Sequence, residues 1–497
     1  MKALTRISLR AAVLGAACLL LLSVAAPAAT ARATLALNPA IGPPTSLVKA
    51  KGSDYAAGEV VALFFDGARV GSAVAGPTGK FNTRFAVPAS ARPGEHAVDA
   101  VGQTSGVSAR ALFLVRTDWL QGCFAGGRSC FNPYENVIGP GNAGALAVAW
   151  RAPVGTDGAS APVYANGLVF VGTSHGLVGL DPASGAIIIN FRSGPVATTP
   201  AVIRGFDPQP DPPGKVVVGS SDGTLQAVST SGTPLWQVGL GRPPASPLVL
   251  QGIGDPNARV IVGAGNVLFA FDGDGNRQWA TVLEGGDIST PAALLQLPDT
   301  PDRVVVAAGD MLYALDAASG AIIWASDPSG HRLGAPSIGD PNVVPNPQVL
   351  VGDAVGNLFS LDPRSGAVVA RFAAGGPISG SPAIGDPNQS LPWVFAGDGS
   401  GTIYGFEDPN ELPPPAWEAT LGGAVDSPSV LANGVIYAAT DPEEGDPHIF
   451  ALDQASGRVL FDGLLPGGVA ASPIVADGRL FVATRSGEVV GYQTPDT

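Results

Sequence analysis

The sequence predicts an all-β protein in two parts, a small β-sandwich followed by an eight-bladed β-propeller. The first observation is a step from a small residue to proline that occurs eight times, mostly about 45 residues apart. A repeat of about 40–50 residues with several short strands is the signature of propeller blades. The second is that apolar runs separated by Gly and Asp follow each step, which is typical of strands joined by tight turns. The eight steps end at Pro162, Pro200, Pro247, Pro291, Pro336, Pro382, Pro428 and Pro473.

One repeat, residues 290–330, shows the pattern most clearly. After an apolar lead, the runs 303–308, 311–316 and 321–324 are separated by short turns that contain glycine. In most other repeats the second run likewise ends in Val-Gly or Ala-Gly, and the third commonly ends in Asp. Each repeat therefore predicts one sheet of four strands.

A large side chain recurs in the last strand of the repeats, usually four residues after the glycine of the preceding turn. A tryptophan that packs there on the neighbouring blade buries upwards of about 150 Å². At about 25 cal/mol per Å², each contact is worth several kcal/mol before entropy is subtracted. The predicted docking residues are Trp150, Trp236, Trp279, Trp324, Trp417 and Phe461, with Ile189 and Ala370 as weaker versions.

The two ends of the repeat region predict how the ring closes. The eighth repeat, Ser472–Tyr492, supplies three strands, and no fourth strand follows it. A matching strand, Leu146–Val154, precedes the first repeat and carries Trp150. We expect this strand to complete the eighth blade, which would also cover an edge that is open to aggregation.

The segment Ala314-x-Asp316-x-x-x-Gly320-x-x-x-Trp324 resembles the tryptophan-docking motif of the quinoprotein, or PQQ-like, β-propeller family. The resemblance extends from about Ala145 to the C-terminus and implies a propeller over residues 145–497. That family includes quinone-dependent dehydrogenases and also cofactor-free binding proteins of the BamB type. The motif therefore indicates the fold and leaves the function open.

Residues 33–116 predict a separate small domain. Runs such as Val60–Phe65, Phe81–Val87 and Arg110–Val115, with turns such as Asp66-Gly67, amount to about seven short strands and suit a sandwich. Short segments that contain proline and glycine, including Val87-Pro-x(4)-Pro93-Gly94, resemble segments of immunoglobulin-like modules in secreted bacterial proteins. The resemblance implies an immunoglobulin-like β-sandwich that acts as a spacer or adhesive stalk.

Residues 117–144 predict an irregular linker that holds Cys123 and Cys130. In an exported chain, an even pair of cysteines most simply forms a disulfide. Closing a loop of this size stabilises by about 2–3 kcal/mol on the entropy model. The alternative, a redox pair, would need Cys-x-x-Cys spacing, which is absent from the sequence.

Residues 1–31 predict a signal peptide, with Lys2, Arg6 and Arg10 before an apolar run and a small-residue cleavage site at 29–31. Gly15 lies where a lipoprotein signal would carry a Leu-like residue, so lipidation of Cys18 is the lesser reading. No second apolar run is long enough to span a membrane. We expect an exported protein that is extracellular, cell-surface or periplasmic.

The net charge of −14 argues against nucleic acid and anionic membranes as partners. Removal of residues 1–31 would take away three basic residues and no acidic one, and leave −17. An acidic surface is also the ordinary way in which an exported protein stays soluble.

The sequence predicts no catalytic residue, no cofactor-binding residue and no metal-binding residue. The four histidines lie in separate repeats or domains, without a second ligand at zinc spacing. Asp272-Gly-Asp274-Gly-Asn276 alternates oxygen ligands as calcium loops do, but Asp-Gly pairs are also good turn formers. Three Gly-Asp-Pro-Asn segments, at 254–257, 339–342 and 385–388, resemble eroded calcium loops of integrin-type repeats. We favour structural turns for all of these, and we expect neither PQQ nor Ca²⁺, since the adjacent cysteines of quinone dehydrogenases are missing.

These observations favour an exported, non-catalytic binding or scaffold protein that presents propeller loops to a protein or a cell-surface glycan, as a monomer. The first alternative is a PQQ- and Ca²⁺-dependent periplasmic or extracellular dehydrogenase, and the second is a calcium-stabilised, integrin-like adhesin. Fold alone does not name the ligand. The loops proposed for binding are Phe206–Gly214, Asn342–Pro347, Asp408–Pro415 and Asp441–Pro447.

Overall fold

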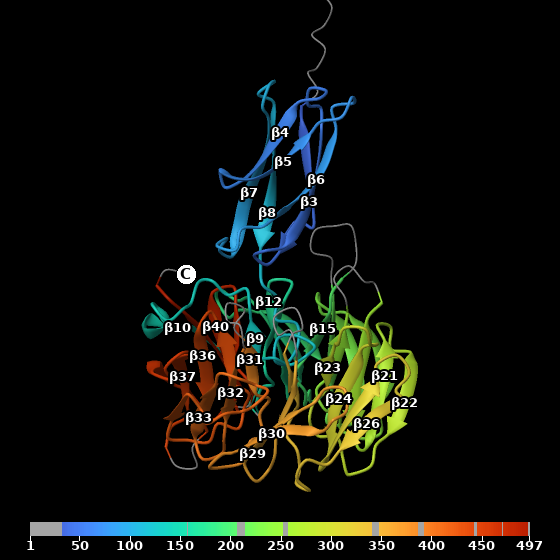
Figure 1. The fold of residues 1–497 in the computed structure, drawn as a ribbon, viewed down its shortest axis with the longest axis vertical. Helices are drawn as coiled ribbons and strands as arrows, with labels where there is room; N and C mark the ends of the chain where they lie inside the picture. The colour runs from blue at the N-terminus through green and yellow to red at the C-terminus, as the bar shows by residue number, and fades with distance from the viewer. Residues whose placement is uncertain are drawn as a thin grey trace, which may run out of the picture.

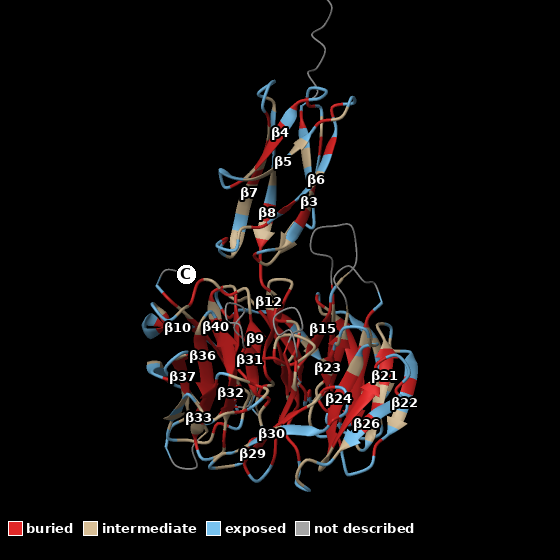
Figure 2. Ribbon diagram, in the orientation of Figure 1, coloured by how far each residue is buried: buried red, intermediate tan, exposed pale blue. Residues whose placement is uncertain are grey.

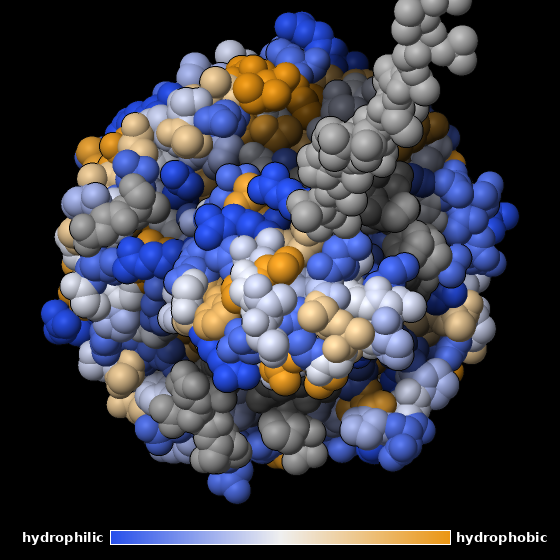
Figure 3. Space-filling model, turned by 90° about the horizontal axis from the view of Figure 1, so that it is seen from above, coloured by the Kyte–Doolittle hydropathy of each residue, from blue (hydrophilic) through white to orange (hydrophobic). Residues whose placement is uncertain are grey.

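The computed structural model describes residues 32–156, 158–205, 214–251, 257–339, 347–385, 392–441, 445–469 and 471–495. Within these ranges the chain forms β-strands and one short 3-10 turn, η1 (Ala143–Ala145). The all-β class predicted from the sequence is therefore confirmed. A small sandwich stands on one face of a larger disc (Figure 1), and the disc has a round outline when seen from the sandwich side (Figure 3).

The N-terminal part is a two-sheet sandwich of 3 and 5 strands, with strand orders β1-β3-β6 and β2-β8-β7-β4-β5. Inward-facing side chains such as Val48, Leu63, Phe85 and Phe113 fill the space between the sheets. The short β2 runs parallel to β8, and the other strand pairs are antiparallel. Its strands are β1 (Thr34–Asn38), β2 (Ile41–Gly42), β3 (Leu47–Ser53), β4 (Val60–Phe65), β5 (Ala68–Val74), β6 (Phe81–Ala86), β7 (Gly94–Gly102) and β8 (Ser108–Val115).

The C-terminal part contains, among the residues described, eight sheets. Each has four antiparallel strands, which are consecutive in the chain except in the last sheet, where three strands join an N-terminal one. The seventh sheet also carries a short fifth strand that runs parallel to its neighbour. Sheets one to four are β11 (Val163–Ala165), β12 (Leu168–Thr173), β13 (Gly176–Leu180), β14 (Ile187–Arg192); β15 (Ala201–Ile203), β16 (Lys215–Gly219), β17 (Thr224–Ser229), β18 (Pro234–Gly239); β19 (Leu248–Leu250), β20 (Arg259–Ala264), β21 (Val267–Asp272), β22 (Arg277–Val282); and β23 (Ala293–Leu295), β24 (Arg303–Ala308), β25 (Met311–Asp316), β26 (Ile322–Ser326). Sheets five to eight are β27 (Ser337–Ile338), β28 (Val349–Gly352), β29 (Asn357–Leu361), β30 (Val368–Ala373); β31 (Ala383–Gly385), β32 (Trp393–Gly397), β33 (Thr402–Phe406), β34 (Trp417–Thr420); β35 (Val430–Ala432), β36 (Val435–Ala439), β37 (His448–Asp453), β38 (Val459–Leu464); and β39 (Ile474–Ala476), β40 (Arg479–Ala483), β41 (Glu488–Gln493), β10 (Ala147–Pro153).

Burial explains the pattern of each blade. The inner strands are buried on both faces because each blade packs between two neighbours, so they are nearly continuous apolar runs, as in β12 and β24. The outermost strands, such as β22, are mostly exposed and bury only an occasional large side chain. Figure 2 shows the buried inner strands and the exposed outer edge.

The eighth blade joins the two ends of the propeller. Strand β10 pairs antiparallel with β41, and Trp150 lies opposite Gly491. This strand supplies the outer edge that the last repeat lacks, and the strand order of the sheet is β10-β41-β40-β39.

The tryptophans of the outer strands join neighbouring blades. In five blades the indole N–H donates to a backbone oxygen in a turn of the next blade, at 2.9–3.3 Å. The ring lies over the glycine of that turn, where an added Cβ would lie only 2.4–2.7 Å from a ring carbon. Phe461 instead packs edge-on against Tyr492. The ring–glycine pairs are Trp150 on Gly185, Trp236 on Gly275, Trp279 on Gly320, Trp324 on Gly366 and Trp417 on Gly457.

The segment 119–132, which the sequence leaves as irregular linker, follows a defined course inside the propeller. It runs past the innermost strands of all eight blades in chain order and hydrogen-bonds to each of them, and we call it the linker ring. Its short strand β9 (Phe131–Asn132) pairs parallel with β35. The bonds join Trp119 to Tyr164, Leu120 to Val202, Gln121 to Val249, Gly126 to Leu294, Gly127 to Ile338, Ser129 to Ile384, Cys130 to Leu431 and Asn132 to Val475.

Candidate functional site

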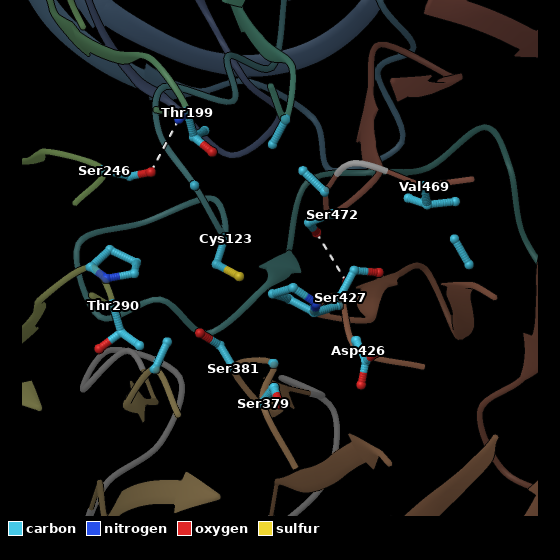
Figure 4. A pocket seen from close by; sticks show the side chains of 18 of the residues that line it. Cys123, Thr199, Ser246, Thr290, Ser379, Ser381, Asp426, Ser427, Val469 and Ser472 are labelled. Carbon is cyan, nitrogen blue, oxygen red and sulfur yellow. Dashed lines mark hydrogen bonds between the residues drawn. The ribbon is translucent and has the colours of Figure 1, made fainter. Parts of the chain in front are cut away.

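The linker ring divides the central channel of the propeller. Its anchor Thr117 bonds to Asp477, in the turn between the first and second strands of blade eight, so the ring enters from the face that carries the sandwich. A cavity of about 280 Å³ lies on the other side of the ring. Its walls come from the opposite ends of the blades, where the fourth strand of one blade leads into the first strand of the next. We call this cavity the channel mouth (Figure 4).

The small-residue–proline steps of the sequence form the wall of the channel mouth. Each step lies just before an innermost strand, where eight blades converge on the axis and only small side chains fit. Six of the eight steps carry a hydroxyl, so the wall is polar although its side chains are short. The step residues that line the cavity are Ala161, Thr199, Ser246, Thr290, Ala335, Ser381, Ser427 and Ser472.

Some of these hydroxyls join neighbouring blades and others are unpaired. Ser246 Oγ accepts the backbone N–H of Thr199 at 3.0 Å, and Ser472 Oγ donates to the backbone oxygen of Pro428 at 3.1 Å (Figure 4). Thr290 Oγ1 and Ser427 Oγ are buried and have no hydrogen-bond partner within the described ranges. A buried polar atom without a partner is costly and calls for an explanation.

The floor of the channel mouth is the linker ring itself. Gly122, Cys123 and Arg128 line the cavity, and a disulfide joins Cys123 to Cys130. Four residues of this loop that are not glycine have positive φ: Cys123 (60°), Phe124 (72°), Arg128 (57°) and Cys130 (50°). Since each such residue costs about 1 kcal/mol or more, strain of this kind tends to gather at functional sites.

Arg128 is a cation that is 7% exposed and has no carboxylate partner among the residues that the structure describes. Its Nε and Nη2 each donate to Ser381 Oγ at 3.3 Å, and Nη1 donates to the backbone oxygen of Gly122 at 3.4 Å. Both acceptors are neutral and all three bonds are long. Burial lowers the pKa of the guanidinium to about 10, so it stays protonated at neutral pH.

The rim of the channel mouth carries the other charges. Arg485 Nη1 lies 2.7 Å from Asp441 Oδ2, so these two charges compensate each other. Asp426 is exposed on the rim. The arrangement places one uncompensated positive charge at the floor and one carboxylate at the entrance.

The residues predicted from the sequence fall in different places. The cysteines lie at the floor of the channel mouth, whereas the docking aromatics lie at the periphery, between outer strands. Of the four proposed loops, only Asp408–Pro415 lies wholly within the described residues, and it joins β33 to β34 at the sandwich face. The Gly-Asp-Pro-Asn segments fall mostly outside the described residues.

The acidic turn 272–276 uses its oxygens within the protein. Asp272 Oδ1 accepts the backbone N–H groups of Asp274 and Asn276, both at 2.9 Å, and Asp274 pairs with Lys215 at 2.6 Å. Across the described part of the chain, no group of three or more His, Cys, Asp and Glu side chains is placed to hold a metal.

The lining of the channel mouth does not fit a quinone cofactor. A planar, aromatic tricarboxylate needs a flat surface to stack on and several cations. The lining residues include no aromatic side chain, and of the two arginines one is paired with Asp441. The two cysteines are separated by 7 positions in the chain and are not adjacent.

Sequence comparison identifies the propeller. The model of the family described as outer membrane protein assembly factor BamB matches residues 142–313, 308–408 and 400–496, which together span most of the chain. The chain belongs to this family of PQQ-like β-propellers, as the docking motif predicts. No functionally curated protein matches it.

Solved structures share the fold at low sequence identity. Quinohemoprotein alcohol dehydrogenase from Comamonas testosteroni has a TM-score of 0.58 at 15% identity, over 77% of this chain and 82% of that one. BamB from Moraxella catarrhalis has a TM-score of 0.50 at 18% sequence identity, over 70% of this chain and 99% of that one. The computationally designed protein Ika8 has a TM-score of 0.55 at 16% sequence identity, over 70% of this chain and 99% of that one. An enzyme, an assembly factor and a designed protein thus share this fold, which by itself decides nothing about activity.

Among the residues described, no helix is long and apolar enough to cross a membrane. Sequence reasoning missed Arg128 and the hydroxyl wall of the channel mouth. The hydroxyls had a usable signal, because Ser or Thr precedes proline in six of the eight steps. Arg128 had none, since a lone arginine in a glycine-rich linker is typical of a surface loop.

Proposed function

We propose that the protein is an exported, non-catalytic binding protein that holds a protein partner on the propeller face with the channel mouth. The observation that carries this proposal is the linker ring, which fills one end of the channel and leaves a polar cavity open at the other. A propeller closed in this way is a rigid disc with one concave face. Concave sites with a few convergent polar groups are the usual place for ligands.

The chemistry of the cavity supports binding over catalysis. Its wall offers hydroxyls and its floor a guanidinium. None of the described lining serines or threonines is hydrogen-bonded to a histidine or a carboxylate that would activate it as a nucleophile. The BamB-type family to which the chain belongs supports a protein as the partner. The sandwich, on the opposite face, suits a spacer that keeps the mouth free.

Site-specific photo-crosslinking tests this proposal. A benzophenone side chain is placed at Ser379 or Asp426, which are exposed lining residues of the mouth, and at Leu235, which is 45% exposed on the outer strand β18, as the control. The full-length protein is expressed in the bacterium that makes it, and the exported fraction is irradiated. We expect one protein adduct from the mouth positions and none from Leu235.

Three results would overturn the proposal. Equal adducts from Leu235 and the mouth would place the contact elsewhere, and adducts that carry sugar and no peptide would favour the glycan. A large rise in melting temperature with PQQ and Ca²⁺ together, reversed by chelator, would favour the dehydrogenase.

A further inference from the structure

The guanidinium of Arg128 is buried at the floor of the channel mouth with bonding capacity to spare. A guanidinium has five N–H donors and no acceptor. Three of these donors make long bonds to Ser381 Oγ and Gly122 O. One N–H on each terminal nitrogen is left without a partner in the described part of the chain, and both nitrogens belong to a residue that lines the cavity.

A structural role does not account for this arrangement. A buried charge that lacks an opposite charge costs several kcal/mol, and an apolar side chain of similar volume would fill the same space without that cost. The backbone of Arg128 is also in the left-handed region, with φ of 57°. The protein therefore bears both strain and desolvation to keep a cation at this point, and a bound anion would recover part of that free energy.

The geometry of the guanidinium suits an oxyanion. Ser381, whose Oγ accepts Nε and Nη2, and Cys123 line the same cavity (Figure 4). A carboxylate that meets the guanidinium could accept its two remaining N–H groups, the geometry that arginine favours.

We propose that the channel mouth binds a carboxylate group, with Arg128 as its charged anchor. The charges favour a monoanion over a dianion, because the floor holds one uncompensated positive charge and Asp426 stands at the rim. This inference rests on the proposed function for the identity of the molecule that bears the carboxylate. That molecule is the partner protein, which inserts an acidic side chain or its C-terminus into the mouth.

Titration with small probes tests the pocket without the partner. Acetate labelled with ¹³C is titrated into the full-length, disulfide-bonded protein at constant ionic strength, and binding is followed by the line width of its carboxylate signal. We expect saturable binding that Arg128→Met weakens by about tenfold or more, since charge-assisted bonds are lost. The matched control is Arg485→Met, which removes the paired, exposed arginine of the same cavity and should change the affinity less than about twofold.

Further variants keep the test decisive if Arg128→Met does not fold. Arg128→Lys retains the charge but loses the planar fork and should bind a few-fold more weakly, whereas Thr290→Val, a change in the cavity wall at nearly constant volume, should leave the affinity within about twofold of the wild type. Inorganic phosphate, mostly a dianion at pH 7.5, should bind more weakly than acetate. Tighter binding of phosphate, or acetate binding unchanged in both Arg128 variants, would overturn the proposal.

Peptide probes decide where the carboxylate comes from. N-acetyl-Ala-Ala-Ala with a free C-terminus is compared with its C-terminal amide. A protein source predicts that the acid binds more tightly than acetate and that the amide does not bind. If the peptide acid binds no better than acetate, the ligand of the pocket is a free small acid. That result would contradict insertion of a partner protein, although the pocket would still bind carboxylates. Failure of crosslinking with normal acetate binding would contradict only the proposed function.

Discussion

The eight blades and the linker ring are built on opposite principles. The blades repeat one plan, with a small-residue–proline step, buried inner strands and, in five of them, a tryptophan on the next blade's glycine. The ring, residues 119–132, hydrogen-bonds to every blade but repeats nothing. It also holds four strained residues, a disulfide and an unpaired cation within the stretch 123–130.

The difference indicates how a symmetric frame acquires a specific site. A ring of equivalent blades presents near-equivalent groups around its axis. The Ser and Thr hydroxyls of the small-residue–proline steps therefore do not distinguish one side of the channel from another. A non-repeating segment laid across the channel breaks that equivalence, because it places Arg128 beside Ser381 of one blade only. In this protein the repeats supply stability, and the linker ring supplies the chemical distinction between one side of the channel and another.

The largest effect should come from the repeated part. Trp324 is 7% exposed, lies over Gly366 and donates to Pro363 at 3.1 Å. Replacing a buried tryptophan by alanine costs about 3–5 kcal/mol through lost burial and the cavity left behind. We therefore expect Trp324→Ala to lower the free energy of unfolding by about that much, as measured by denaturant titration followed by circular dichroism.

Trp236 offers a matched control for this loss. It occupies the same position in blade two and donates to Gly273 at 3.1 Å, but it is only half-buried. Trp236→Ala should cost clearly less than Trp324→Ala. An equal or greater loss would show that burial of the docking ring does not set its contribution, and that the blades are not held together as described.

The next effect concerns the linker ring. The Cys123–Cys130 bridge closes a short loop, and its removal should cost about 2–3 kcal/mol on the loop-entropy model. Because Arg128 lies within this loop, Cys123→Ser with Cys130→Ser should also weaken acetate binding, which Trp324→Ala should leave nearly unchanged. Melting curves and the acetate titration measure the two effects. A double serine variant that loses stability but binds acetate normally would contradict the link between the bridge and the site.

The contrast between blades and ring also explains how much the sequence could predict. The all-β class and the family were accessible because blades bury their strands in the same way each time, so that Pro, Gly, Asp and Trp recur at fixed spacing. The spare strand at 146–154 was recognisable as the outer strand that the last repeat lacks, and the structure pairs β10 with β41.

The course of the linker ring could not be predicted for a physical reason. Its position is fixed mainly by backbone groups of the innermost strands, such as the N–H groups of Leu294 and Ile338, which bond to Gly126 and Gly127 at 2.7 Å. Backbone groups leave no side-chain pattern in the sequence. For the same reason the burial of Arg128 was invisible, since it follows from where the ring lies and not from any neighbouring residue type.

The smallest predicted effect is a pH dependence at the point where the ring is anchored to the blades. Asp477 Oδ1 accepts the N–H of Thr117 at 2.7 Å, and Oδ2 accepts the hydroxyl of Tyr164 at 2.9 Å. Burial, chiefly, and the nearby Asp118 raise the pKa of Asp477 from 3.8 to about 7, although the hydrogen bonds from Thr117 and Tyr164, and the charge of Arg116, oppose the shift. A raised pKa means that the folded protein holds the proton more tightly than the unfolded chain. The stabilisation that this gives is complete below about pH 4 and is lost as the pH rises through 7.

Asp477→Asn imitates the protonated form and tolerates the left-handed backbone at this position, where φ is 49°. We expect the variant to match the wild type at pH 5 and to exceed its stability by about 2 kcal/mol at pH 8, where the wild type must bury a charge. Melting temperatures at the two pH values measure the difference, with Asp426→Asn on the opposite face as the control. If the variant is less stable than the wild type at pH 8, the carboxylate is a net anchor for Thr117, and the joint between ring and blades strengthens with pH instead of weakening.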